Sequence, residues 1–162
     1  MQKDPFERFL GDLEYPLFIV TARLGHGGEP TGCLVGFATQ CSISPPRMLV
    51  CISKVNHSFL IMSRATHLAV HVVDHDQHEL AELFGGKTGD EINKFELCQW
   101  IAGPYDVPFV VGPRRRMLVR VIERHDLGDH LGILVSPLET IATASDQLSP
   151  SQIKDLVPGH PI

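Results

Sequence analysis

The chain has 162 residues, of which 43% are hydrophobic and 20% are charged, and its net charge is -5. These values fit one globular domain and argue against intrinsic disorder, a disulfide-stapled mini-protein or a large nucleic-acid interface. No apolar run approaches the roughly 18 residues of a membrane span, and residues 1–9 lack a secretory apolar core. We therefore expect a cytoplasmic protein without membrane contact, with one domain over residues 1–162, a core over about 15–143 and a tail over 144–162.

The first predicted element is a short helix that begins after Asp4. Asp4 is a good N-cap, Pro5 suits the first turn, Glu7 lies three positions after the cap, and Gly11 can end the helix. From Pro16 onward the sequence changes to short apolar runs, rich in β-branched residues and separated by Gly and Pro, which are typical of strands. We expect six strands, over residues 17–22, 32–42, 48–53, 68–73, 117–124 and 130–138.

Short helices complete the predicted pattern. Residues 57–65 and 77–84 carry apolar positions at helical spacing, and Ser149, Pro150 and Gln152 predict a capped helical turn in the tail. The connections between strands are too short for regular βαβ crossovers, which disfavours a doubly wound parallel sheet. The sequence therefore predicts a mainly β fold, a Greek-key β-barrel with short flanking helices.

The cysteines and the glycine-rich segments exclude several kinds of site. Cys33, Cys41, Cys51 and Cys98 are widely spaced and form no C-x-x-C pair, so we expect free, buried thiols. The segment Phe84-Gly85-Gly86-Lys87-Thr88 contains Gly-Lys-Thr but is no phosphate-binding Walker loop, because Ala81 stands where a glycine is required. No nucleophile elbow and no catalytic-thiol signature is present, which disfavours covalent hydrolysis.

Gly36 is the anomaly of the second predicted strand, which runs on to Pro45 and Pro46. A glycine weakens the middle of a strand unless its missing side chain lets another group, such as a flat aromatic ring, approach the backbone. A simple β-bulge is the alternative. Ser42 and Ser44 alternate along the same stretch, so their hydroxyls point to one side, toward a polar ligand or toward the turn.

Residues 53–58 predict a phosphate site before a helix. The start of a helix offers free amide groups and a positive dipole end, and Lys54, Asn56 and Ser58 add one charge and neutral donors. An ordinary helix cap uses the same residue types and remains the alternative.

Histidines provide two further hypotheses. His71, His75 and His78 lie close together in sequence, which raises a metal site, although a strand and the loop beyond it need not converge on one ion. Solvated loop histidines are the alternative. His130 follows the predicted tight turn Gly128-Asp129 at the start of a strand, where it is a candidate for relaying protons or for a structural hydrogen bond.

The order of these pieces resembles the flavin reductase family with the FMN-binding split-barrel fold. The resemblance runs from about residue 15 to residue 137. Its signposts, in chain order, are Pro16 with residues 18–22, Thr31-Gly32, Ser42-Ile43-Ser44-Pro45-Pro46, residues 49–53, Asn56-x-Ser58, Leu80-Ala81, residues 84–88, Phe95, Trp100 and Gly128-Asp129-His130.

The resemblance implies a homodimer of split β-barrels, each binding FMN or FAD that is reduced by NADH or NADPH. The implied reaction is hydride transfer, in which the protein supplies orientation and electrostatics and the cofactor supplies the chemistry. A flavin-dependent oxygenase is the implied acceptor of reduced flavin. Three alternatives stay open: a non-catalytic flavin carrier or sensor, a split barrel that uses a deazaflavin or haem, and the metal-dependent barrel.

The resemblance also assigns residues. Those implied to line the flavin ring are Leu34, Val35, Gly36, Phe37, Ala38, Cys41, Ser42, Ile43 and Ser44. Those implied at the ribityl phosphate are Ser53, Lys54, Asn56, His57 and Ser58. Phe84, Gly85, Gly86, Lys87 and Thr88 are implied to close over the outer part of the flavin or the nicotinamide, and His130 to lie near the reacting face as the catalytic residue.

One departure from the family pattern concerns the second strand. Many members carry hydroxyl residues in its middle, whereas this chain has Leu34, Gly36 and Phe37 there. We expect backbone amides beside Gly36 to replace the missing side-chain donors.

Overall fold

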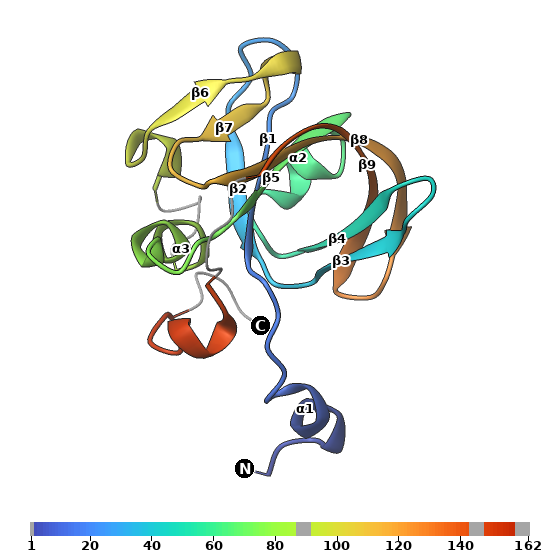
Figure 1. Cartoon of the computed structure of the whole chain (residues 1–162), viewed down its shortest axis with the longest axis vertical. Coiled ribbons are helices and arrows are strands. Elements are labelled where there is room, and N and C mark those ends of the chain that lie inside the picture. Colours follow the sequence, from blue (N-terminus) through green and yellow to red (C-terminus); the bar gives the residue numbers. More distant parts are fainter. Residues whose placement is uncertain (1, 87–91, 143–147, 158–162) are drawn as a thin grey trace.

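The computed structural model describes residues 2–86, 92–142 and 148–157. Seven strands of this part form one antiparallel sheet in the order β2-β1-β5-β8-β9-β4-β3 (Figure 1). Their bounds are β1 (Phe18–Ala22), β2 (Thr31–Val35), β3 (Ala38–Ser42), β4 (Arg47–Ser53), β5 (His67–Val72), β8 (Arg115–Asp126) and β9 (His130–Ala142). Two further strands, β6 (Trp100–Ala102) and β7 (Pro108–Val110), pair separately as an antiparallel hairpin.

The connection between β2 and β3 closes the sheet into a barrel. These strands stand at opposite ends of the sheet order, yet only Gly36 and Phe37 separate them in the chain. A link of that length spans at most about 11 Å, so the sheet must curl until its two ends meet. One core cluster accordingly contains Val35 from β2 together with Val50 and Ile52 from β4. The mainly β barrel with small helices that the sequence predicts is confirmed.

Strand β1 is buried on both faces because the barrel carries a second layer outside it. Val20 points into the barrel core, whereas its neighbour Ile19 joins an outer cluster with Phe84, Phe95 and Leu148. A strand covered on both faces is buried along its whole length, and all five β1 residues are buried, four of them apolar. The outer layer comes mainly from α3 (His78–Gly85), η1 (Lys94–Glu96) and the C-terminal η3 (Pro150–Ile153).

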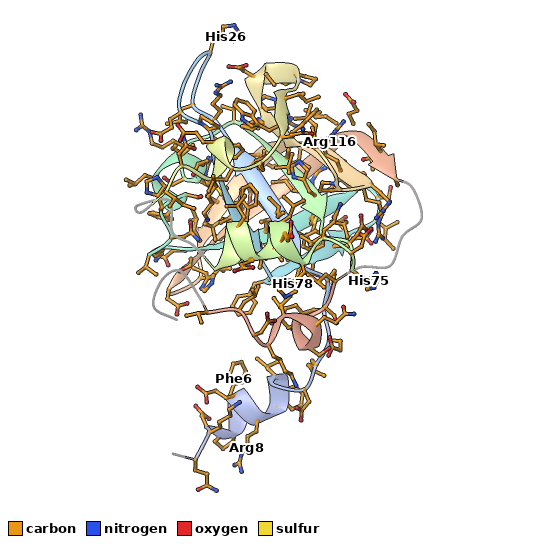
Figure 2. All side chains as sticks on the ribbon, turned by 90° about the vertical axis from the view of Figure 1, so that its left-hand side faces the viewer. Phe6, Arg8, His26, His75, His78 and Arg116 are labelled. Carbon is orange, nitrogen blue, oxygen red and sulfur yellow. The ribbon has the colours of Figure 1, made fainter. Side chains whose placement is uncertain are left out.

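The remaining helical elements are α1 (Pro5–Leu10), α2 (Phe59–Met62) and η2 (Pro104–Asp106). Helix α1 begins as predicted, since the Asp4 carboxylate accepts a hydrogen bond from the Phe6 N–H at 3.0 Å. It buries no residue and extends away from the barrel, with Phe6 and Arg8 on its surface (Figures 1 and 2). The capping box predicted at Ser149 is also present. None of the helices in the described ranges has the length and hydrophobicity needed to span a bilayer.

Three details differ from the sequence-based predictions. The long strand expected over residues 32–42 is two strands, because the chain turns at Gly36 and Phe37 from one end of the sheet to the other. The β6–β7 hairpin was not predicted, since each strand has only three residues and prolines lie at both ends of the turn. Finally, the four cysteines are free as predicted, but only Cys33 is buried, whereas Cys51 and Cys98 are half-buried and Cys41 is exposed.

Candidate functional site

A cavity of about 470 Å³ lies where the β2–β3 link, β4 with its following turn, and the β8–β9 turn meet. Its volume falls within the range of small-molecule and cofactor sites. The lining residues are Tyr15, Leu17, Cys33, Leu34, Val35, Gly36, Phe37, Cys51, Ile52, Ser53, Lys54, Val55, Asn56, Asp129 and His130. Segments that are distant in sequence therefore contribute to one site.

Most of this cavity wall is apolar. Leu34, Val35 and Ile52 contribute hydrocarbon side chains, and the two lining cysteines behave in the same way. Burial raises the pKa of Cys33 to about 11 and also raises the pKa of Cys51, so both remain neutral thiols near pH 7. The wall can hold a flat apolar ring and keep water from it, but it offers no thiolate nucleophile.

The turn after β4 forms a polar edge of the cavity. The Lys54 ammonium lies 2.7 Å from the Asp126 carboxylate, and this ion pair lowers the pKa of Asp126. The Lys54 backbone N–H donates to the Asp129 carbonyl at 2.9 Å, which ties this turn to the β8–β9 turn. An ion pair at such an exposed position is weak, so Lys54 can exchange Asp126 for the phosphate of a ligand.

His130 stands at the first position of β9, opposite Ser53 of β4. Its Nδ1 lies 2.8 Å from the Asp129 carboxylate. A carboxylate only accepts hydrogen bonds, so Nδ1 carries the hydrogen and Nε2 remains for a ligand. The pair lowers the pKa of Asp129. The imidazole also lies against the ring of Phe37, with 5.0 Å between ring centroids, which limits its rotation.

The space beside Gly36 is taken by a side chain of the protein. A Cβ atom built on Gly36 would lie 2.7 Å from Cε2 of Tyr15 and 3.6 Å from Cδ2 of Leu17. A flat aromatic ring therefore does approach the Gly36 backbone, as the sequence suggested, but this ring is the side chain of Tyr15. Any ligand in the cavity meets Gly36 with Tyr15 already beside it.

The structure brings together only part of the residue set predicted from the sequence. Leu34, Val35, Gly36, Phe37, Ser53, Lys54, Asn56 and His130 line the cavity. Ala38, Cys41, Ser42, Ile43, Ser44, His57, Ser58, Phe84, Gly85 and Gly86 do not. Lys87 and Thr88 lie outside the described residues. Sequence reasoning missed Tyr15, Leu17, Cys33, Cys51, Ile52, Val55 and Asp129. Adjacency to predicted residues and the strand alternation could have indicated Cys33, Cys51, Ile52, Val55 and Asp129, whereas Tyr15 and Leu17 had no such signal.

Ser58 and Phe84 are buried, and each connects β2 to a helix. Ser58 is 1% exposed, and its hydroxyl lies 2.8 Å from that of Thr31 at the start of β2. Phe84 is also 1% exposed, and its carbonyl accepts a hydrogen bond from the buried Lys94 ammonium at 2.9 Å. Ser58 faces Thr31 instead of the cavity, and Phe84 packs in the outer cluster.

The histidines considered for a metal site have other partners. His71 is fully buried, its Nδ1 lies 2.9 Å from the Ile19 carbonyl, and its Nε2 accepts the Val110 N–H at 3.0 Å. His78 pairs with Asp155 of the C-terminal segment at 3.1 Å, whereas His75 is exposed (Figure 2). In the part of the chain that the structure describes, no three His, Cys, Asp or Glu side chains are grouped to hold a metal ion.

Comparison with known proteins agrees with this architecture. At 30% identity over 145 residues, the chain is similar to the NADH-dependent FMN reductase SmoA of Agrobacterium fabrum, covering 88% of this chain and 79% of that protein. It is 26% identical over 146 residues to the reductase component of 4-hydroxyphenylacetate 3-monooxygenase of Escherichia coli, covering 88% of this chain and 84% of that protein. A similar fold occurs in the NADH:FAD oxidoreductase SgcE6 of Streptomyces globisporus, with a TM-score of 0.79, 22% identity and coverage of 92% and 91% of the two chains. Residues 10–150 match the family described as flavin reductase like domain, and the chain belongs to that family.

Proposed function

We propose that this protein is a flavin reductase, which transfers a hydride from NADH or NADPH to FMN or FAD. The observation that carries the proposal is that residues 34–37, residues 53–56 and His130 converge on one cavity in a chain of this family. Two similar proteins named above are described as an FMN reductase using NADH and as an NADH:FAD oxidoreductase. The choice between FMN and FAD, and between NADH and NADPH, is part of what the assays below test.

The chemistry of the cavity fits a flavin. An isoalloxazine ring is flat and largely apolar, which suits the wall formed by Leu34, Val35 and Ile52. The ribityl phosphate is polar and anionic, which suits the edge formed by Ser53, Lys54 and Asn56. We assign these residues to the two ends of the cofactor.

A bound flavin supplies the hydride acceptor, so the protein needs no covalent nucleophile. The apolar wall excludes water from the reacting ring, which strengthens the electrostatic interactions inside the cavity. His130 holds one hydrogen at Nδ1 toward Asp129 and keeps Nε2 for proton exchange with a ligand. Lys54 anchors the anionic end of the cofactor and thereby orients the ring.

We further propose that the protein is a homodimer and supplies reduced flavin to a flavin-dependent oxygenase. Support for the oxygenase comes from the relatives, since one is the reductase component of 4-hydroxyphenylacetate 3-monooxygenase and another is a reductase subunit of a flavin-dependent monooxygenase. The homodimer has its support in the family resemblance. Size-exclusion chromatography with light scattering tests the dimer.

Steady-state oxidation of NADH and NADPH, each with FMN and with FAD, tests the proposed reaction. We expect oxidation of at least one nicotinamide that depends on added flavin. A protein that binds flavin but oxidises neither nicotinamide is a carrier or sensor, and the reductase proposal then fails. A protein that binds no flavin contradicts the site as well.

A further inference from the structure

Tyr15 brings an aromatic ring to the cavity from the segment before β1. The side chain is half-buried and lines the cavity together with Leu17. Its Cε2 atom stands 2.7 Å from the point where a Cβ of residue 36 would be, so the ring fills the position that a side chain at residue 36, in the β2–β3 link, would otherwise take. Only glycine at position 36 permits this approach without displacing the ring.

The Tyr15 hydroxyl remains available to a ligand. Within the described ranges of the chain it makes no hydrogen bond, whereas the side chain packs against the outer cluster that contains Leu17 and Leu148. A tyrosine that lines a cavity can pack its ring against a flat aromatic ligand and donate a hydrogen bond from its unpaired hydroxyl to a polar group of that ligand. The neighbouring positions Leu34, Gly36 and Phe37 offer no side-chain hydroxyl.

The C-terminal segment holds Tyr15 in place. Hydrogen bonding from Ser151 and Ser149 lowers the pKa of Glu14, which places the C-terminal turn beside the residue that precedes Tyr15. On the other side of Tyr15, the Leu17 carbonyl accepts the Val73 N–H at 3.0 Å, and the Val73 carbonyl accepts the Leu148 N–H at 2.7 Å. The ring is therefore fixed from both ends of its segment, which reduces the entropy that a ligand must remove on binding.

We propose that Tyr15 directly contacts the isoalloxazine ring and replaces the side-chain contact that Gly36 does not make. The ring of Tyr15 packs against the flavin, and its hydroxyl hydrogen bonds to a polar edge of the cofactor. Residues 148–157 act by keeping Tyr15 in position. This inference rests on the proposed function, because it requires that the cavity binds a flavin.

The fluorescence of bound FMN tests this contact. Free FMN fluoresces, and a tyrosine in van der Waals contact quenches the emission by electron transfer, whereas phenylalanine does not. The sequence has two tyrosines and one tryptophan, all in the described part of the chain, and of these only Tyr15 lines the cavity. We expect quenched FMN on the wild-type protein and a severalfold brighter FMN on Tyr15→Phe. The dissociation constant of FMN should rise about twofold to tenfold on Tyr15→Phe, which corresponds to the free energy of one lost hydrogen bond.

Ultrafiltration measures FMN binding independently of fluorescence and separates the two proposals. If the wild-type protein retains no FMN, the proposed function fails. If FMN is retained but is equally fluorescent on the wild-type protein and on Tyr15→Phe, the contact is absent and this inference alone is overturned. Tyr105→Phe is the matched control, because Tyr105 stacks on His67 away from this cavity.

Gly36→Ala gives a second and independent variant. The new methyl group displaces the Tyr15 ring, so we expect brighter bound FMN in the wild-type background. In the Tyr15→Phe background the same substitution should add no further brightness, because the quencher is already gone. Equal increases in both backgrounds contradict the proposed contact.

Discussion

Lowering the pH from about 6.5 to 4.5 will destabilise this fold through His71. The imidazole is fully buried and joins three strands, because its Nδ1 hydrogen bonds to the Ile19 carbonyl of β1 and its Nε2 accepts the Val110 N–H of β7. Protonation of Nε2 removes this acceptor and places a charge in the core. Burial, with a smaller contribution from Arg116, lowers the pKa of His71 to about 4.

The magnitude follows from the difference between the folded and unfolded states. The unfolded chain takes up a proton as the pH falls through about 6.5, whereas folded His71 stays neutral until about pH 4. Between these values the unfolded state binds more protons, so the free energy of unfolding falls by up to about 1.4 kcal/mol per pH unit. The loss by pH 4.5 is about 2 kcal/mol, a substantial part of the roughly 5–15 kcal/mol typical of a domain.

Urea unfolding at pH 6.5, 5.5 and 4.5 measures this loss, with the single tryptophan, Trp100, as the fluorescence probe. His71→Asn keeps a donor and an acceptor but does not titrate, so its stability should depend much less on pH in this window. His67→Asn is the matched control at a half-buried imidazole, whose pKa is also lowered by burial but to a smaller extent, and it should retain most of the wild-type slope. Equal slopes for the wild type and His71→Asn would refute the reasoning. Carboxylates with lowered pKa values, such as Glu14 and Asp76, add a loss of stability that begins at about pH 5, but this loss is shared by the wild type and His71→Asn and cancels in the comparison of their slopes.

Three substitutions separate cofactor contacts from structural ones. Ser58→Ala should lower the free energy of unfolding by about 1–3 kcal/mol, because buried Thr31 loses its partner, and should leave FMN affinity unchanged. Lys54→Ala should weaken FMN binding by about threefold to tenfold, and the effect should shrink at high salt. Asp129→Ala should reduce kcat/KM for nicotinamide oxidation by less than about tenfold, because the exposed carboxylate only orients His130.

Each of these predictions has a result that would contradict it. Riboflavin lacks the phosphate, so its affinity should not change on Lys54→Ala; an equal loss for riboflavin and FMN contradicts the phosphate assignment. Asp126→Asn frees Lys54 from its ion pair and should tighten FMN binding. A loss of FMN affinity on Ser58→Ala at unchanged stability would place Ser58 at the cofactor after all. For Asp129→Ala, an unchanged pH profile of kcat/KM argues against any orienting role.

The sequence predicts the strands well because local composition determines them. β1, β4 and β5 consist mostly of apolar residues and are buried or half-buried throughout, and their predicted limits lie within one residue of those observed. The sequence did not show that the predicted strand over residues 32–42 divides at Gly36 into β2 and β3. This division follows from the sheet order, which places β2 and β3 at opposite ends and which the sequence does not reveal. The β6–β7 hairpin is held partly by the distant pair Arg23–Asp106, which no local pattern reports.

The site was predictable only where its residues are contiguous in the chain. Residues 34–37 and 53–56 line the cavity, and each segment lies at the end of a strand, β2 or β4, that the sequence places in this part of the chain. Ser58 was expected at the phosphate because capping and anion binding use the same residue types; the structure gives it Thr31 as a partner. Tyr15 was missed because it lies outside every predicted strand and meets Gly36 only in the folded chain, 21 positions away in sequence.

FMN binding to a variant with a filled cavity tests the central claim most directly. Cys51 is half-exposed and lines the cavity, so Cys51→Phe places a ring in the proposed flavin site instead of in the barrel core. Leu97→Phe, at an exposed position outside the cavity, is the control for adding a phenyl ring. We predict that Cys51→Phe loses more than about tenfold in FMN affinity while unfolding at a similar urea concentration, and that Leu97→Phe binds FMN like the wild type. Wild-type affinity in a folded Cys51→Phe protein would contradict the claim that this cavity is the flavin site.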